Sequence, residues 1–305
     1  MATAAATGAE VRALSIVVLL LSDVGAWACA ACGCGDQSLT ALGVEQPYVN
    51  RLRVALEGRL TSLDSGDSSG QKVLSLRSSL TLLWAPHTRF AFAALLPWSS
   101  SWLLPHAGGP SQLVSGLSDL ELSMRAVVYR DRRFSAHHLL WLSGGLKFPT
   151  GPRISDARGY PVPDDDQPGS GSWDPFFGAA YGYYGDPMAL FFSASYRQTT
   201  PGPFGYRFGS TLGATATVQL HPVWWLAMPI GFEFRWAESD SLPNRHAAPN
   251  TGGALVDFSP GVIVSPLRST NLQFRLSVGV PVVQGLHGVQ RVGPQTTLMI
   301  AYDIL

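Results

Sequence analysis

The sequence predicts an all-β fold, a transmembrane up-and-down antiparallel β-barrel of about twelve strands. Polar and apolar residues alternate with a period of two in segment after segment. Long and short connections alternate between these segments. Beyond residue 28, no continuous apolar run reaches the roughly twenty residues that a membrane-spanning helix needs. A chain that crosses lipid without helices must close its sheet, because lipid cannot satisfy open strand edges.

Composition limits the function classes. The 305 residues carry a formal net charge of +0, and charged residues make up 14% of the chain, below the roughly 25% usual for soluble domains. The basic residues are almost all arginine, since Lys72 and Lys147 are the only lysines. With no excess of positive charge, a nucleic-acid partner is not expected.

The N-terminus has the features of a secretory signal peptide. Arg12 precedes the apolar run ALSIVVLLL at 13–21, and Ala26-Trp27-Ala28 offers a cleavage site. We expect residues 1–28 to be removed and the mature chain to be exported to the outer membrane of a Gram-negative cell. Residues 29–49 then form a Cys-containing periplasmic segment, and residues 50–305 form the barrel.

The segment GLSDLELSMRAVVYR at 116–130 illustrates the strand pattern, because Asp119, Glu121 and Arg125 alternate with leucine, methionine and alanine. Such a strand has one face for lipid and one for an enclosed interior. Aromatic residues gather near the strand ends, as expected at membrane interfaces. The expected strands are 51–63, 72–84, 88–98, 116–130, 135–148, 173–185, 188–198, 206–220, 223–236, 254–265, 271–283 and 295–305.

The connections favour the barrel over a secreted β-sandwich. We expect a connection at 64–71, long loops at 99–115, 149–172 and 237–253, a medium loop at 199–205 and a longer connection again at 284–293, with short turns alternating between them. Outer-membrane barrels have tight periplasmic turns and long external loops. A sandwich also predicts alternation, but it does not predict so many long strands in strict up-and-down order.

Three short motifs carry a resemblance to a known group. GLSDLEL (116–122), LKFPTG (146–151) and GSGSWDP (169–175) resemble motifs of the outer-membrane channel family associated with the meta-pathway of phenol degradation. The resemblance implies a barrel that passes small molecules, aromatic ones among them. It implies no catalytic residue.

Charged residues on the expected inner face are the candidate pore-lining residues. They would either pair across a filled interior or line water in an open one. The candidates are Arg53, Glu57, Arg59, Arg77, Asp119, Glu121, Arg125, Lys147, Arg197, Glu233, Arg235 and Arg275.

The cysteines form a second candidate site. Cys29, Cys32 and Cys34 all lie in CAACGC. One reading is a local disulfide between Cys29 and Cys32 with a remaining thiol. Another is a Cu or Zn site, since thiolates are suitable ligands for both metals. Lipidation of Cys29 is a third. Apart from this alternative, no cofactor is expected.

Two further features of the sequence bear on function. The aspartates of 149–174 lack the spacing of a Ca²⁺ loop, and we expect a solvated external loop there. Outer-membrane phospholipases are barrels too, but no serine is spaced to share a site with His137 or His138. We therefore expect no enzyme.

The expected function is a channel for passive passage of small solutes, aromatic or anionic ones included. The alternative is a barrel that anchors a metal-binding or partner-docking periplasmic N-terminus.

Overall fold

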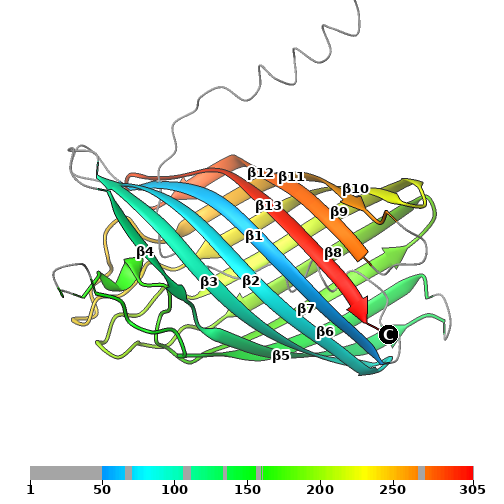
Figure 1. The fold of residues 1–305 in the computed structure, drawn as a ribbon, viewed down its shortest axis with the longest axis horizontal. Helices are drawn as coiled ribbons and strands as arrows, with labels where there is room; N and C mark the ends of the chain where they lie inside the picture. The colour runs from blue at the N-terminus through cyan, green and yellow to red at the C-terminus, as the bar shows by residue number, and fades with distance from the viewer. Residues whose placement is uncertain are drawn as a thin grey trace, which may run out of the picture.

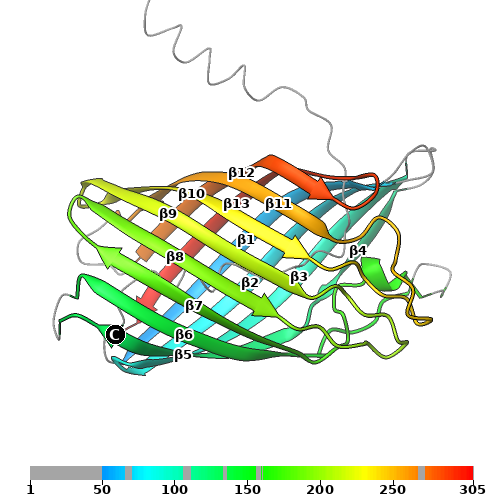
Figure 2. The same cartoon turned by 180° about the vertical axis from the view of Figure 1, so that it is seen from behind.

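The computed structural model describes residues 50–304, except 66–70, 106–110, 133–135, 156–158, 160 and 267–271. Its strands form a closed, tilted antiparallel ring (Figures 1 and 2). The predicted fold class is confirmed, with twelve strand positions in the ring. The strands are β1 (Arg51–Ser65), β2 (Gln71–His87), β3 (Phe90–Pro105), β4 (Gln112–Leu117), β5 (Leu120–Arg130), β6 (His138–Phe148), β7 (Asp174–Tyr184), β8 (Met188–Arg197), β9 (Thr211–Val223), β10 (Leu226–Ala237), β11 (Gly253–Val264), β12 (Leu272–Leu286) and β13 (Gln290–Ile304).

The ring closes where β1 pairs with β13, the first and last strands of the chain. β1 also pairs with β2, and β2 pairs with β3, so the order around the barrel follows the order in the sequence. No helix in the described part of the chain is long and apolar enough to span a membrane.

The thirteen strands of the described chain form a barrel of twelve strand positions, because β4 and β5 lie end to end along the same edge of β3. Trp98–Leu103 of β3 pairs with β4, and Phe90–Leu95 pairs with β5. Ser118 and Asp119 separate the two strands. The segment 116–130 is thus not one uninterrupted strand as predicted. The cause is the binding of Asp119 by a distant loop, described below.

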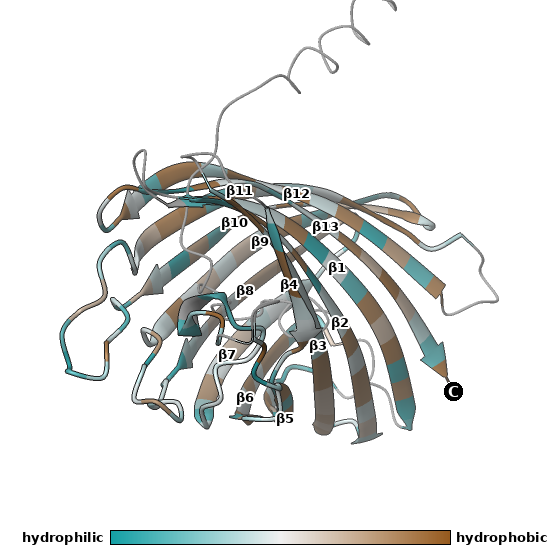
Figure 3. Cartoon of the chain, turned by 60° about the vertical axis from the view of Figure 1, so that its left-hand side comes forward, coloured by the Kyte–Doolittle hydropathy of each residue, from teal (hydrophilic) through white to brown (hydrophobic). Residues whose placement is uncertain are grey.

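Hydrophilic and hydrophobic residues alternate along the strands (Figure 3), and the exposure of the side chains differs between the two faces of the barrel. On β5, Leu122 and Met124 are 42% and 46% exposed, whereas Glu121 is 1% exposed. On β13, Leu298 is 51% exposed and Met299 is 5% exposed. The outer surface is therefore an apolar band, and the charged side chains lie inside. This arrangement suits lipid, where a charged side chain at the midplane costs roughly 2–4 kcal/mol.

The two ends of the barrel differ in their connections. At one end, called the turn end, Arg89 and Trp225 lie in tight turns between strands. At the other, called the loop end, β6 and β7 are joined by residues 149–173, and a short 3-10 helix, Asp164–Asp166, lies in that loop. Figure 1 shows this helix at the opposite end from the C-terminus.

Two predicted connections were wrong. Residues 99–105 continue β3 and 112–117 form β4, because serines with strand-compatible spacing bond across the hairpin, with Ser100 Oγ 2.7 Å from Ser115 Oγ. Residues 284–293 are mostly strand, and only 287–289 connect β12 to β13. Gln284 tightens this hairpin, since its side chain accepts from the Val292 backbone N–H and donates to the Val292 carbonyl, both at 2.9 Å.

Candidate functional site

Two cavities lie inside the barrel within the part of the chain that the structure describes. The loop-side cavity, of about 180 Å³, opens among Arg59, Arg77, Lys147 and the loop at Pro168. The turn-side cavity, of about 390 Å³, lies among Trp141, Phe191, Glu233 and Arg275. Glu233 lines one and Arg235, the next inward residue of β10, lines the other. The two cavities share no described lining residue, and a level of charged side chains lies between them.

Asp119 holds the 149–173 loop against the loop end of the barrel. Its Oδ1 accepts the Gly151 N–H at 3.0 Å. Its Oδ2 accepts the Ser170 N–H at 2.8 Å, the Ser170 hydroxyl at 2.9 Å and the Gly171 N–H at 3.3 Å. Asp119 is 2% exposed. A buried carboxylate requires such donors, so these bonds explain why Asp119 leaves the strand ladder.

Glycines allow the loop to approach this closely. A Cβ on Gly169 would lie 2.6 Å from Asp119 Oδ1, and one on Gly151 would lie 3.0 Å from the same atom. Gly171 has φ +66°, a conformation that glycine adopts readily. All three motifs behind the family resemblance therefore meet at one place: GLSDLEL supplies the acceptor, and LKFPTG and GSGSWDP supply the donors.

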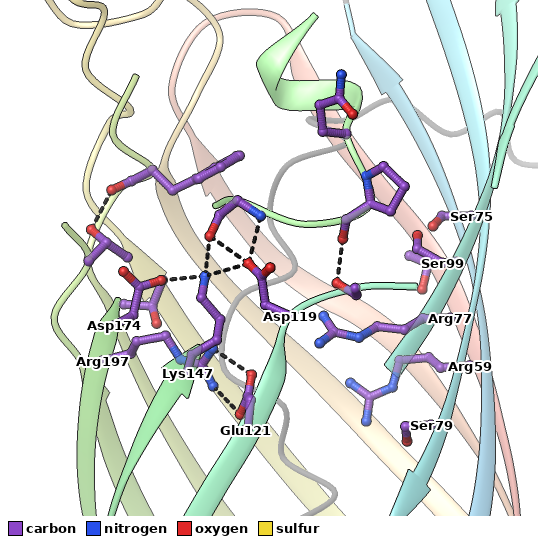
Figure 4. Close-up of a pocket in the computed structure, with 18 of the residues that line it drawn as sticks. Arg59, Ser75, Arg77, Ser79, Ser99, Asp119, Glu121, Lys147, Asp174 and Arg197 are labelled. Carbon is purple, nitrogen blue, oxygen red and sulfur yellow. Dashed lines mark hydrogen bonds and ion pairs between the residues drawn. The ribbon is translucent and has the colours of Figure 1, made fainter. Parts of the chain in front are cut away.

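Lys147 extends this network into the loop-side cavity. It lies between Asp119, at 3.6 Å, and Asp174, with which it forms an ion pair (Figure 4). Glu121 makes a bidentate pair with Arg197, at 2.7 and 2.8 Å. The register explains the cluster, because Lys147 of β6 lies opposite Glu121 of β5 and Asp174 of β7.

A belt of charges lies at the level between the two cavities. Arg59 Nη2 lies 3.4 Å from Glu57 Oε1, and Arg235 Nη2 lies 3.5 Å from Asp257 Oδ2. Arg77 is the cross-strand neighbour of Arg59. Both signs of charge occur at the same level, and all of these residues except Asp257 were predicted to line the interior.

A third set of charges joins the ends of the ring. Asp303 of β13 accepts from Arg51 at 2.9 and 2.8 Å and from Arg53 at 2.7 and 2.7 Å, and all three residues are buried. Since β1 and β13 are the strands whose pairing closes the barrel, this cluster lies on the seam.

Three predicted residues have a different environment. Among the described residues, no hydrogen bond or ion pair is formed by the side chains of Arg125, Glu233 or Arg275. Glu233 and Arg275 line the turn-side cavity, and Arg125 lines neither cavity. These three side chains are the charged candidates that are not already neutralised by a contact within the barrel wall.

Among the buried charges that sequence reasoning missed are Arg51, Asp174, Asp257 and Asp303. Each is buried. Asp257 and Asp303 occupy those alternate positions of their strands whose side chains point into the barrel. The alternation in the sequence alone could therefore have identified them. Asp174 was expected in a solvated loop, which is wrong: it begins β7, is 0% exposed, and accepts the Thr200 N–H at 2.9 Å as well as pairing with Lys147.

Among the described residues, no group of three His, Cys, Asp or Glu side chains is arranged to hold a metal ion. Cys29, Cys32 and Cys34 lie outside the described residues, as do the expected signal peptide and the segment to residue 49. His138 lies beside aromatic rings, with Nδ1 2.6 Å from the Tyr181 hydroxyl.

Comparison with known proteins identifies the fold. No family model and no curated protein sequence matches the chain. The crystal structure of the COG4313 outer membrane channel from Pseudomonas putida F1 is similar, with a TM-score of 0.68 and 18% identity over 86% of this chain and 98% of that one. The transport unit of the autotransporter AIDA-I from Escherichia coli gives a TM-score of 0.50 at 9% identity, covering 86% of this chain and 92% of that one. The barrel fold implied by the motif resemblance is confirmed.

Proposed function

We propose that the protein is an outer-membrane channel through which small solutes, aromatic and anionic ones among them, diffuse passively. The observation that carries the proposal is the pair of interior cavities, which lie on either side of a charged belt inside a closed ring with an apolar outer band. The similar fold of an outer membrane channel supports the location and the role.

The inner charges support a preference for anions. Lys147 and the arginines outnumber the carboxylates on the inner face, and charged rings of one sign bias a pore towards the opposite ion. The basic residues are Arg51, Arg53, Arg59, Arg77, Arg125, Lys147, Arg197, Arg235 and Arg275, and the acidic ones are Glu57, Asp119, Glu121, Asp174, Glu233, Asp257 and Asp303.

An apolar wall supports passage of aromatic solutes. Trp141 and Phe191 are buried and line the turn-side cavity together with Tyr184. Tyr184 and Phe191 meet edge to face, with ring centroids 5.5 Å apart. Ligand cavities of about this size commonly combine such a wall with a few polar groups.

The test is single-channel recording of the purified protein in planar bilayers, with KCl gradients to measure the reversal potential. We expect discrete conductance steps and a reversal potential of the sign that indicates anion preference. Folded protein that inserts without conducting would refute the channel. Liposome swelling with uncharged sugars measures the passage of neutral solutes independently.

The alternative role of the N-terminal cysteines stays a prediction, since these residues lie outside the described part of the chain. Metal analysis of the mature protein, compared with a variant in which Cys29, Cys32 and Cys34 are serine, tests it. Equal metal content in the two proteins would contradict a Cu or Zn site.

A further inference from the structure

Among the described residues that line the turn-side cavity, one cation and one anion form no hydrogen bond or ion pair. Arg275, on β12, lies in register with Met299 of β13 and Ile263 of β11, which are both apolar neighbours. No described residue hydrogen-bonds to its guanidinium or lies within ion-pair distance of it. The carboxylates whose charges act on it are chiefly Glu233 and Glu57. A half-buried guanidinium in this setting lacks the fixed acceptors that buried charges normally have.

Glu233 is the complementary group. It lies on β10, lines the same cavity, and has no hydrogen bond or ion pair to a described residue. Its cross-strand neighbour Asp257 is bound by Arg235 at 3.5 Å and by Gln295 at 3.2 Å. Glu233 and Arg275 therefore face a shared space without a direct contact.

The other charged residue of this cavity is already neutralised. Arg53 is bound to Asp303 at 2.7 Å through two of its nitrogens. His221, which also lines this cavity, has a hydrogen-bond partner, because its Nε2 lies 2.8 Å from the Gln219 side-chain nitrogen. Arg275 and Glu233 are thus the two charges of the described cavity lining that a bound molecule could satisfy.

The charges select the class of ligand. A simple anion would neutralise Arg275 but would bring a second negative charge towards Glu233. A simple cation would do the reverse. A molecule with both a carboxylate and an ammonium group satisfies both residues at once, and hydrogen bonds to charged partners are the strong ones.

The aromatic part of the cavity lining selects the rest of the ligand. Trp141, Tyr184 and Phe191 present aromatic surface to the same cavity, whose volume is about 390 Å³. Aromatic rings prefer offset or edge-to-face packing against other rings. Figure 2 shows that β6, β7 and β8, which carry these residues, form a separate part of the ring from β10 and β12.

We infer that the turn-side cavity is a binding site for an α-amino acid with an aromatic side chain. Arg275 receives the carboxylate, Glu233 receives the ammonium group, and the ring lies against Trp141, Tyr184 and Phe191. The inference deepens the proposed channel function, because it assigns a solute class to the path. The binding itself does not require that the barrel conducts.

Three related probes test the assignment: L-phenylalanine, 3-phenylpropanoate, which lacks the ammonium group, and 2-phenylethylamine, which lacks the carboxylate. Their affinities for the detergent-solubilised mature protein are measured by equilibrium dialysis at neutral pH. We expect phenylalanine to bind about tenfold or more tightly than either analogue, since each analogue loses one charged hydrogen-bonding group, worth about a factor of ten or more.

Variants locate the site. Arg275→Gln is expected to weaken phenylalanine binding about tenfold while leaving 2-phenylethylamine unchanged, and Glu233→Gln is expected to weaken phenylalanine while leaving 3-phenylpropanoate no weaker. Arg125→Gln is the matched control, because Arg125 also has no partner among the described residues and lines neither cavity. Its phenylalanine affinity should equal that of the unmodified protein.

Other outcomes overturn the inference. Equal affinity for all three probes, or no binding, excludes a zwitterion site, and tighter binding of 3-phenylpropanoate than of phenylalanine indicates a plain anion site. If a variant fails to fold, the probe series on the unmodified protein still decides. KCl conductance recorded on the same preparation separates the two proposals. Conduction without phenylalanine binding contradicts only the proposed binding site, and binding without conduction contradicts only the proposed channel function.

Discussion

Replacing Asp119 by asparagine should release the 149–173 loop from the barrel. The carboxylate accepts four hydrogen bonds, from the N–H groups of Gly151, Ser170 and Gly171 and from the Ser170 hydroxyl. Asparagine keeps one acceptor oxygen, and its amide group presents donors where the other oxygen accepted. If the asparagine oxygen takes the place of Oδ2, the Gly151 bond is lost and the other three become neutral, which about halves the roughly 1.5–3 kcal/mol of each. The free energy that holds the loop closed should fall by roughly 3 kcal/mol at least, about a hundredfold in the closing equilibrium.

Hydrogen exchange followed by mass spectrometry measures this change directly. Peptides that cover 149–173 should lose protection by about a hundredfold in the variant, while peptides of the barrel strands should not change. Glu238→Gln is the control, because Glu238 accepts from Arg207 and Ser210 in other loops. Unchanged protection of 149–173 in a folded Asp119→Asn barrel would refute the idea that Asp119 fastens this loop.

Three more changes follow from the same geometry. Glu121→Gln leaves the buried Arg197 without its bidentate carboxylate and should cost about 3–5 kcal/mol in the free energy of unfolding, measured by urea titration in detergent micelles. Gly169→Ala places a Cβ 2.6 Å from Asp119 Oδ1, so exchange of the 149–173 amides should rise. Leu298→Arg puts a charge on the outer face of β13 and should lower stability in lipid vesicles by roughly 2–4 kcal/mol.

Each of these changes has a control that the structure supplies. The double variant Glu121→Gln with Arg197→Met should recover part of the lost stability, because no unpaired buried charge remains. Gly58→Ala meets nothing within 4 Å and should leave loop exchange unaltered. Thr297→Arg faces the interior, so it should destabilise the protein less than Leu298→Arg. An equal cost at both positions would contradict a lipid-facing outer surface.

Alternation in the sequence was sufficient to predict the barrel and the side to which most charges point. The inward phase of Glu121, Arg197 and Arg235 is readable because apolar residues occupy the intervening positions, and burial of the apolar face fixes the register. The same phase identifies Asp257, which was overlooked.

The partners of these residues were not predictable. Lys147 meets Asp174 across a 25-residue loop, and Asp303 meets Arg53 across 250 residues. Strand alternation gives the direction of a side chain but not its height within the barrel, since height depends on the stagger between strands. The interruption of the strand at Asp119 was missed for a related reason: the donors that draw this residue out of the ladder lie about 50 positions further along the chain.

The cluster of Arg51, Arg53 and Asp303 has a consequence for assembly. The two strands of each hairpin are close in the sequence and can pair locally. This cluster, in contrast, joins residues separated by 250 or more positions. Bringing such remote segments together costs conformational entropy that no local contact offsets. Pairing of the first and last strands is therefore expected to be the last step of folding. The ion pairs of these three side chains form only at that step, and they then stabilise the closed barrel.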